Sequence, residues 1–93
     1  MSRAKKPLWV VYILRCAGGT LYTGVTTDLT RRLAQHNAGT ASKYTRSRRP
    51  VTMVYREPAK THGDALRREV AIKKLSRAAK DALVATQRRR KRA

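Results

Sequence analysis

The order of apolar and polar positions along the chain predicts three strands. Residues 8–16 (LWVVYILRC) are almost all β-branched, aromatic or aliphatic, as in a central strand that is covered on both faces. Residues 17–20 (AGGT) predict a hairpin turn, and residues 21–25 (LYTGV) predict the returning strand. After Pro50, residues 51–56 alternate in side-chain character, which is typical of a third, antiparallel strand.

Capping residues delimit three helices. Residues 26–28 (TTD) supply N-cap side chains for a helix that runs to about residue 37, and Gly39 is placed to end it. Thr61 begins a second helix to about residue 75, with Asp64 as a capping-box variant. Ser76 caps a third helix to about residue 86. The order β-β-α-β-α-α predicts an α+β fold in which a small three-stranded antiparallel sheet is flanked by helices.

Length and charge restrict the class of function. The 93 residues suit one domain, which we place at residues 7–86 between basic tails at residues 1–6 and 87–93. Lysine and arginine number 23 against five acidic residues, which gives a net charge of +18, while the hydrophobic content of 41% is that of a globular protein. This charge favours a polyanionic partner, DNA or alternatively RNA, contacted through its phosphates.

Other classes of protein are not expected. No apolar run approaches the roughly 18 residues of a membrane span, so no membrane partner is expected. A signal-peptide pattern is not recognisable, and the single Cys16 cannot form an internal disulfide. These features together predict a cytoplasmic protein.

Arg32 and His36 lie where the first predicted helix should meet the core. At about 100° per residue, both fall on the arc that contains Leu29 and Leu33, one helical turn apart. A snorkelling arginine and a half-buried histidine with satisfied hydrogen bonds would explain the pair. However, neither residue gains from the charge of the other in so basic a chain, and an anionic ligand would satisfy both.

Glu69 is the acidic residue in the least expected place. On the second predicted helix it falls within an arc of apolar and small residues, where a carboxylate must be paired or must bind a cation, because its desolvation is costly. Two interpretations remain open, an ion pair with Lys73 or Arg32 and a ligand to Mg²⁺. Of the other acidic residues, three are suited to helix starts and Glu57 falls in a loop.

Five short stretches occur at a characteristic spacing. They are residues 10–12 (VVY), residues 22–24 (YTG), the pair Arg32 and His36, residues 43–46 (KYTR) and residues 67–75 (RREVAIKKL). Over about residues 8–84 the chain thereby resembles the GIY-YIG nuclease superfamily, specifically its small standalone bacterial subgroup. Glycine is absent from the first half-motif and Thr23 replaces isoleucine in the second, both at packing positions.

The resemblance implies a metal-dependent phosphodiesterase. Glu69 would hold one divalent ion, Mg²⁺ or Mn²⁺, that is otherwise largely hydrated and stabilises the leaving 3′-oxygen. Arg32 would brace the phosphate with its planar donor fork. Either Tyr12 or Tyr22 would help to deprotonate the attacking water, with His36 as hydrogen-bond partner or proton relay. Since a free phenol titrates near about 10, this role requires nearby cations that favour phenolate.

Residues for binding nucleic acid are expected in the basic loop at residues 42–49 and in the C-terminal basic run. They are Lys43, Tyr44, Arg46, Arg48, Arg49, Arg88, Arg89 and Arg90. Asn37 is expected as a supporting residue behind the catalytic ones or as a contact to substrate.

Two functions follow from these residues. The first is a DNA endonuclease, structure-selective or weakly sequence-dependent, acting in repair or recombination. The alternative is a non-catalytic module that binds DNA or structured RNA. Phosphate binding alone does not require a carboxylate among cations, which favours the nuclease.

The hairpin turn determines whether Tyr12 and Tyr22 can share a site. A regular two-residue turn at Gly18-Gly19 would place the two rings on opposite faces of the sheet. We therefore expect a bulged or three-residue turn, with both hydroxyls on the side facing Arg32 and Glu69.

Overall fold

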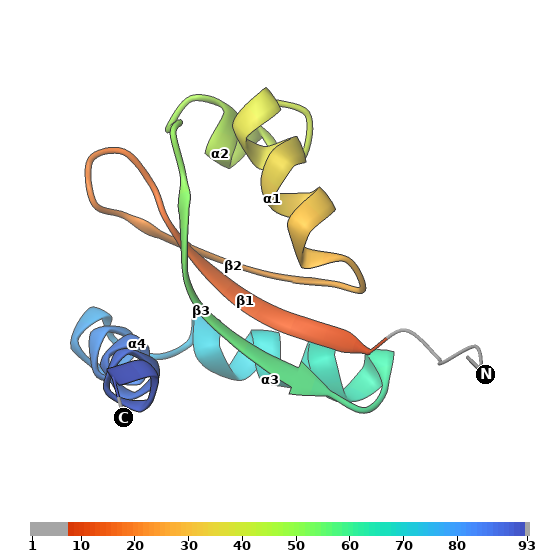
Figure 1. Cartoon of the computed structure of the whole chain (residues 1–93), viewed down its shortest axis with the longest axis vertical. Coiled ribbons are helices and arrows are strands. Elements are labelled where there is room, and N and C mark those ends of the chain that lie inside the picture. Colours follow the sequence, from red (N-terminus) through yellow and green to blue (C-terminus); the bar gives the residue numbers. More distant parts are fainter. Residues whose placement is uncertain (1–7, 93) are drawn as a thin grey trace.

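One antiparallel sheet with helices on both faces forms the fold (Figure 1). The computed structural model describes residues 8–92, and side chains within residues 8–87. The elements are β1 (Trp9–Arg15), β2 (Leu21–Thr26), α1 (Leu29–Ala38), α2 (Lys43–Arg46), β3 (Thr52–Ala59), α3 (His62–Lys73) and α4 (Arg77–Arg92). The sheet order is β2-β1-β3, and both pairings are antiparallel. The predicted α+β fold is confirmed, with the short helix α2 as an addition.

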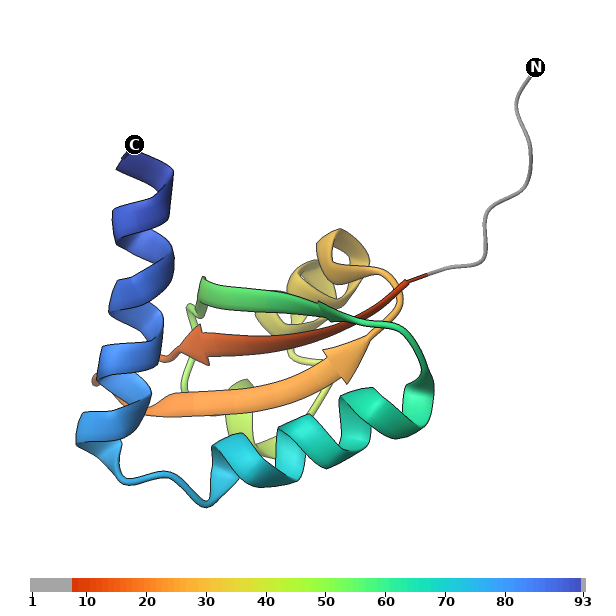
Figure 2. The ribbon, with the colours of Figure 1, turned by 90° about the horizontal axis from the view of Figure 1, so that it is seen from below.

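The helices cover the two faces of the sheet separately. In Figures 1 and 2, α1 and α2 lie on one face, whereas α3 runs across the other and α4 stands beside β3. Successive side chains of β1 point to opposite faces, so this strand contributes to two hydrophobic clusters. The cluster under α3 and α4 contains Val11, Ile13, Tyr55, Ala65, Ile72 and Val84. The cluster under α1 contains Tyr12, Leu14, Cys16 and Val51, with Tyr22, Leu29, Leu33 and Met53 packed against it.

The hairpin between β1 and β2 has the expected three-residue turn. The backbone N–H of Cys16 donates to the carbonyl of Thr20 at 2.8 Å, which leaves residues 17–19 as the loop. Gly18 and Gly19 have φ of 90° and 95°, a conformation that glycine adopts without strain. In the resulting register Tyr12 pairs with Gly24 and Leu14 with Tyr22. Directly opposite residues share a face, so both tyrosine rings lie on the α1 side of the sheet.

The predicted capping residues are confirmed. Side-chain oxygens of Asp28, Thr61 and Ser76 accept backbone N–H groups of the first turns of α1, α3 and α4 at 3.1, 3.0 and 3.1 Å. Gly39 ends α1 in the left-handed conformation, with φ of 85°. The boundaries of these helices are therefore set by local hydrogen bonds that can be anticipated from residue type and position.

Three boundaries differ from those expected. The loop at residues 42–49 contains α2, because Ser42 caps a single helical turn by accepting the N–H of Thr45. Strand β3 continues to Ala59 instead of ending near residue 56. Helix α4 continues to Arg92, so most of the expected tail at residues 87–93 is helical, as suits a run of strong helix formers. The expected tail at residues 1–6 lies outside the described residues.

Candidate active site

Tyr12 and His36 form the centre of a buried hydrogen-bonded cluster. Their side chains come from β1 and α1, and the two residues are only 2% and 1% exposed. The Tyr12 Oη lies 2.9 Å from His36 Nε2, and His36 Nδ1 lies 2.8 Å from Thr45 Oγ1. Thr45, on α2, is fully buried. Both ring nitrogens of His36 therefore have partners, which fixes the orientation of the imidazole.

Gly24 in β2 makes room for the Tyr12 ring. A Cβ atom at Gly24 would lie 2.5 Å from the Tyr12 Oη and 2.6 Å from Cζ, closer than non-bonded atoms approach. The ring thus lies directly against the β2 backbone, and its hydroxyl reaches the edge strand of the sheet. An isolated glycine inside a strand often marks such a close approach, so the position of Gly24 in the sequence already points to a packed neighbour.

Tyr22 lies in a column of rings beside the cluster. Its ring centroid is 5.1 Å from that of His36, edge to face, and 5.9 Å from that of Tyr44, stacked. The guanidinium carbon of Arg48 lies 3.8 Å from the Tyr44 ring centroid, a cation–π arrangement. Tyr22 thus packs against the imidazole, whereas Tyr12 is the tyrosine that is hydrogen-bonded to it.

Arg32 supplies the positive charge next to the cluster. It is partly buried on α1, one turn before His36, as the helical periodicity predicted. It also lines a hollow of about 280 Å³ between the end of β2 and α1. The other residues of this hollow are Thr26, Thr27, Asp28, Arg31 and Gln35.

Burial keeps both Tyr12 and His36 uncharged. Burial raises the pKa of the Tyr12 phenol, and the charges of Tyr22 and Glu69 raise it further, whereas Arg32 lowers it. Burial, and then the charge of Arg32, lower the pKa of His36. Nearby cations, which the role of a tyrosine in deprotonating water requires to favour phenolate, do not do so in the protein alone, because desolvation outweighs the charge of Arg32. A neutral imidazole can nevertheless accept the phenol proton.

Glu69 lies on α3, on the opposite face of the sheet from α1 (Figure 2). Its side chain is 17% exposed on α3, and Oε2 lies 3.2 Å from Lys73 Nζ, so of the two ion pairs that the sequence allows, the one with Lys73 forms. The negative charge of Glu69 is the smallest of the causes that shift the pKa of Tyr12, and it raises that pKa. The rings share one face, as expected, and it is the face under α1, which carries Arg32; α3, which carries Glu69, packs on the other face.

The remaining carboxylates have other partners. Asp28 caps α1. Arg68 Nε donates to Glu57 Oε2 at 2.8 Å, Asp64 pairs with Arg67, and Asp81 pairs with Arg77. Among residues 8–92, no three His, Cys, Asp or Glu side chains gather as a metal cluster. A single carboxylate suits Mg²⁺, which keeps most of its water and binds substrate phosphate, and does not suit a structural zinc site.

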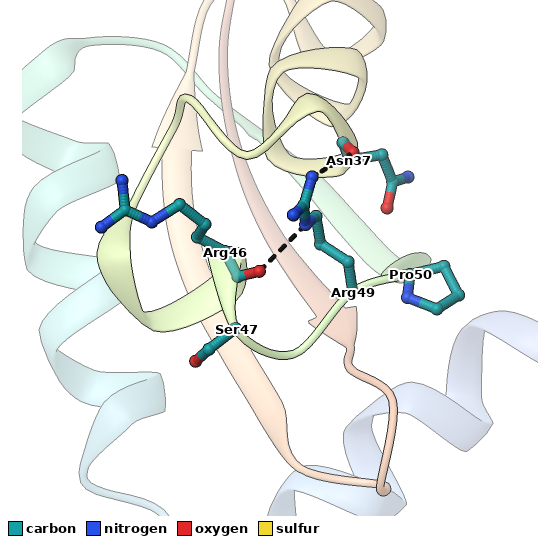
Figure 3. A pocket seen from close by; sticks show the side chains of 5 residues that line it. All are labelled: Asn37, Arg46, Ser47, Arg49 and Pro50. Carbon is teal, nitrogen blue, oxygen red and sulfur yellow. Dashed lines mark hydrogen bonds between the residues drawn. The ribbon is translucent and has the colours of Figure 1, made fainter.

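A basic surface surrounds α2 and the segment after it. We call Lys43, Tyr44, Arg46, Arg48 and Arg49 the α2 surface; four of them are exposed and Arg48 is partly buried. Figure 3 shows how the Arg49 guanidinium is held: Nε donates to the Arg46 carbonyl at 2.9 Å and Nη1 to the Asn37 carbonyl at 3.3 Å. A hollow of about 450 Å³ lies here, lined by Asn37, Arg46, Ser47, Arg49 and Pro50. Arg88, Arg89 and Arg90 fall after residue 87, where the description of side chains ends.

Asn37 joins two elements. Its Nδ2 donates to the Val51 carbonyl at 3.1 Å, and its Oδ1 accepts the Val51 N–H at 2.8 Å. These bonds hold the end of α1 against the segment that enters β3, so the structure shows Asn37 bonded to backbone and not to the Tyr12–His36 cluster. Thr45 could not be identified from the sequence, because one threonine in a basic stretch carries no pattern that distinguishes a buried hydroxyl from an exposed one.

The chain is similar to a family model and to several known proteins. The family model described as the GIY-YIG catalytic domain matches residues 8–82, a range that includes Tyr12, His36 and Glu69. A UPF0213 protein of Desulfotalea psychrophila is 52% identical over 80 residues, which cover 85% of this chain and 73% of that protein. A UPF0213 protein of Halobacterium salinarum is 55% identical over 73 residues, with coverage of 78% and 95%.

Two solution NMR structures are similar to most of the chain. One is a UPF0213 protein of Bacillus halodurans, with 42% identity and a TM-score of 0.56, which covers 85% of this chain and 84% of its own. The other is a protein of E. faecalis, with 40% identity and a TM-score of 0.61, and coverage of 89% and 88%. Both likenesses extend well beyond the motifs around the tyrosines.

Proposed function

Because the chain belongs to the GIY-YIG family, we propose that it is a metal-dependent endonuclease that hydrolyses DNA phosphodiester bonds. The buried hydrogen bond between Tyr12 and His36 carries this proposal, because it joins a phenol to a neutral base beside an arginine and a carboxylate. A module that only binds nucleic acid could use such a hydrogen bond to stabilise its core, but would not need an arginine and a carboxylate whose charges act on it. The biological context that suits such an activity is DNA repair or recombination.

Tyr12 is the tyrosine that takes the proton from the attacking water. As the oxygen of water attacks phosphorus, its proton passes to the Tyr12 Oη while the phenol proton passes to His36 Nε2, 2.9 Å away. The raised pKa of Tyr12 then is no obstacle, since no free phenolate accumulates. Tyr22 supports the imidazole by packing against it.

Arg32 is the residue that binds the scissile phosphate. A guanidinium offers fixed, permanently charged donors that match phosphate oxygens, and charge that develops on these oxygens is stabilised most in a partly dry site. Its place in the hollow beside the cluster leaves it accessible to substrate.

Glu69 is the residue that would hold Mg²⁺ or Mn²⁺. When bound, the metal supplies charge stabilisation at the phosphoryl oxygen and at the leaving 3′-oxygen. Lys73 now pairs with this carboxylate and is itself exposed, so it can move aside without being buried elsewhere.

The α2 surface binds the backbone of the DNA. Its cations match phosphates, which position a duplex but carry no sequence information. The matched range, residues 8–82, is filled by the catalytic domain and has no separate recognition domain within it. We therefore infer a structure-selective or weakly sequence-dependent enzyme.

The test is metal-dependent cleavage of branched, nicked and single-stranded DNA by the wild type and by Glu69→Gln. The variant should lose cleavage by about 100-fold or more while DNA affinity stays equal or rises, because a metal ligand and one negative charge are removed. Initial rates and fluorescence anisotropy measure the two quantities.

Asp81→Asn is the matched control. It also removes one carboxylate from an i,i+4 ion pair, on exposed α4, and should cleave normally. A Glu69→Gln variant that cleaves at the wild-type rate contradicts the assignment of the carboxylate. A wild type that binds all three substrates but cleaves none with either metal would be a non-catalytic module.

A further inference from the structure

The hydrogen bonds of the candidate site continue past His36 toward the surface. Thr45 Oγ1, which bonds His36 Nδ1 at 2.8 Å, also lies 3.0 Å from Ser42 Oγ. Ser42 is only partly buried, whereas Thr45 is fully buried, so the line runs from the interior to a residue that contacts solvent. Four side chains from β1, α1 and the start of α2 thus form one unbroken line: Tyr12, His36, Thr45 and Ser42.

One set of donor directions satisfies every buried group of this line. The phenol of Tyr12 donates to Nε2, and Nδ1–H of His36 donates to Thr45 Oγ1. The hydroxyl of Thr45 then has Ser42 Oγ at 3.0 Å as its nearer acceptor and the Ser42 carbonyl at 3.4 Å as a second one, and Ser42 Oγ also accepts the Thr45 backbone N–H. In the opposite set, the O–H of Tyr12 would lack a partner within the line, and an unpaired buried donor is costly. The resting protein therefore has His36 protonated on Nδ1.

We propose that Thr45 and Ser42 complete a proton relay that carries the proton of the attacking water from Tyr12 through His36 to solvent. The inference rests on the proposed function and adds two residues to it. It requires only that hydrogen-bonded hydroxyls and imidazole pass protons over about 3 Å, which is their ordinary contact distance.

In the relay, each side chain that loses a proton gains another, and one proton leaves to solvent. The oxygen of water bonds to phosphorus as the bond to the 3′-oxygen breaks, and that oxygen takes a proton from solvent. The proton of the attacking water goes to Tyr12 Oη, and the Tyr12 proton goes to Nε2. The Nδ1 proton goes to Thr45 Oγ1, the Thr45 proton to Ser42 Oγ, and the Ser42 proton to bulk water. Reversal of the same transfers, with Tyr12 releasing a proton into the emptied site, resets the line after product leaves.

A relay differs from simple orientation of His36 by Thr45. If Thr45 only held the imidazole in place, a change at Ser42 that keeps the cap of α2 would leave catalysis unaffected. Asparagine is as good an N-cap as serine, but its side-chain carbonyl cannot pass a proton onward. Ser42→Asn therefore interrupts the relay while Thr45 still contacts His36.

The experiment measures kcat, KM and the dependence of kcat on the D₂O fraction for Thr45→Val, Thr45→Ser and Ser42→Asn. Thr45→Val and Ser42→Asn should lower kcat by about 100-fold with KM unchanged, the scale of a missing acid–base step. Thr45→Ser should retain the wild-type rate within about threefold. The curved D₂O dependence of the wild type, a sign of several protons in flight, should become linear in Thr45→Val.

Thermal unfolding and ring ¹⁵N shifts distinguish loss of the relay from misfolding of a variant and from failure of the proposed function. Thermal unfolding checks each fold, and Thr30→Val, on the exposed side of α1, should cleave normally. Ring ¹⁵N shifts should show Nδ1–H for His36 in the wild type and a changed tautomer ratio in Thr45→Val. A folded Ser42→Asn at the wild-type rate, or a wild-type ring protonated on Nε2, overturns the relay. If the wild type cleaves no DNA, the proposed function fails, and the ring shifts alone decide whether the line exists.

Discussion

Burial of two side chains determines the chemistry available at the site. Tyr12 and His36 are almost inaccessible to water, and each is held uncharged by that burial. A charged form of either would lose hydration that Arg32 cannot replace for both at once, since its charge favours phenolate and disfavours imidazolium. The same desolvation that makes Tyr12 a poor free acid keeps His36 ready to accept its proton.

Gly24→Ala tests the close approach of the Tyr12 ring to β2. The added methyl group would meet the phenol at 2.5 Å, so the ring must shift and its bond to His36 must lengthen. We expect a decrease of about 1–3 kcal/mol in the free energy of unfolding, typical of overpacking, together with a loss of cleavage. Denaturant unfolding and DNA cleavage measure these effects.

Gly63→Ala is the matched control for that change. The nearest atom to a Cβ at Gly63 is 3.5 Å away, an ordinary contact, and the position is helical. It should be neutral or stabilising by up to about 1 kcal/mol. Equal stability of the Gly24→Ala protein and the wild type would show that the ring is not confined as described.

His36 makes stability depend on pH in one direction. Its pKa is lowered from the ordinary 6.5, so below that pH the unfolded chain binds a proton that the folded protein resists. The free energy of unfolding should therefore fall as the pH decreases through 6.5, and be insensitive to this residue above it. Unfolding at a series of pH values should show this slope in His62→Gln and lose it in His36→Gln. An NMR titration of His36 with a midpoint above 6.5 would contradict the prediction.

At the scale of helices and strands, capping residues and hydrophobic periodicity were sufficient to predict the long elements from the sequence. The caps at Asp28, Thr61 and Ser76 could be predicted because each oxygen serves the turn directly after it. Helix α2 has only four residues, too few for a periodic pattern. On α3, the apolar side chains on the arc around Glu69 include Leu66 and Val70, but both are exposed, because α3 packs on the sheet through Ala65 and Ile72.

In the candidate site, too, contacts within one helix could be predicted from the sequence, whereas contacts between elements could not. The spacing of Arg32 and His36 along one helix could be seen in the sequence. The partners of His36 could not, because Tyr12 and Thr45 lie 24 and nine residues away and meet only when β1, α1 and α2 pack. The partner of Glu69 could not be chosen from the sequence for the corresponding reason, since it depends on how the side chains near α3 are packed.

Gln87 on α4 is hydrogen-bonded to the backbone of the edge strand β3. Its Oε1 accepts the Arg56 N–H at 2.9 Å and its Nε2 donates to the Arg56 carbonyl at 2.6 Å, as a neighbouring strand would. Gln87→Ala should lower the free energy of unfolding by about 1 kcal/mol and speed amide exchange at Arg56. Denaturant unfolding and hydrogen exchange check this.

Thr86→Ala is the control, because its hydroxyl bonds only within α4, to the Leu83 carbonyl. It should not change exchange at Arg56. Protection of the Arg56 amide that survives in Gln87→Ala would mean that another group, not Gln87, covers this edge.

In the whole molecule, only five acidic side chains oppose 23 lysines and arginines. The five acidic side chains each have a cap or a cation as partner, which leaves a net charge of +18 for the surface. Between residues 8 and 92, no helix is both long and apolar enough to cross a membrane. A field of this size attracts polyanions from a distance and makes their binding dependent on salt.

Replacing Arg88, Arg89 and Arg90 by glutamine tests the end of α4. Glutamine keeps helix propensity, so the change removes charge without shortening the helix. If these residues bind phosphates of duplex DNA, the slope of log affinity against log salt should flatten by about 0.9 for each phosphate that is no longer neutralised. Binding titrations at several salt concentrations measure the slope, and cleavage chemistry should be unchanged. An unaltered slope would mean that the end of α4 lies away from the DNA.

Strand β1 contributes side chains to the hydrophobic clusters on both faces of the sheet, so a change on one face can affect the other. Ile13 belongs to the cluster under α3 and α4, yet its neighbour Tyr12 holds His36 on the opposite face. Because Ile13 is fully buried in a packed cluster, a larger side chain there is expected to shift β1, and Tyr12 with it. Such a substitution is therefore expected to alter the Tyr12–His36 hydrogen bond without changing any residue proposed to contact substrate.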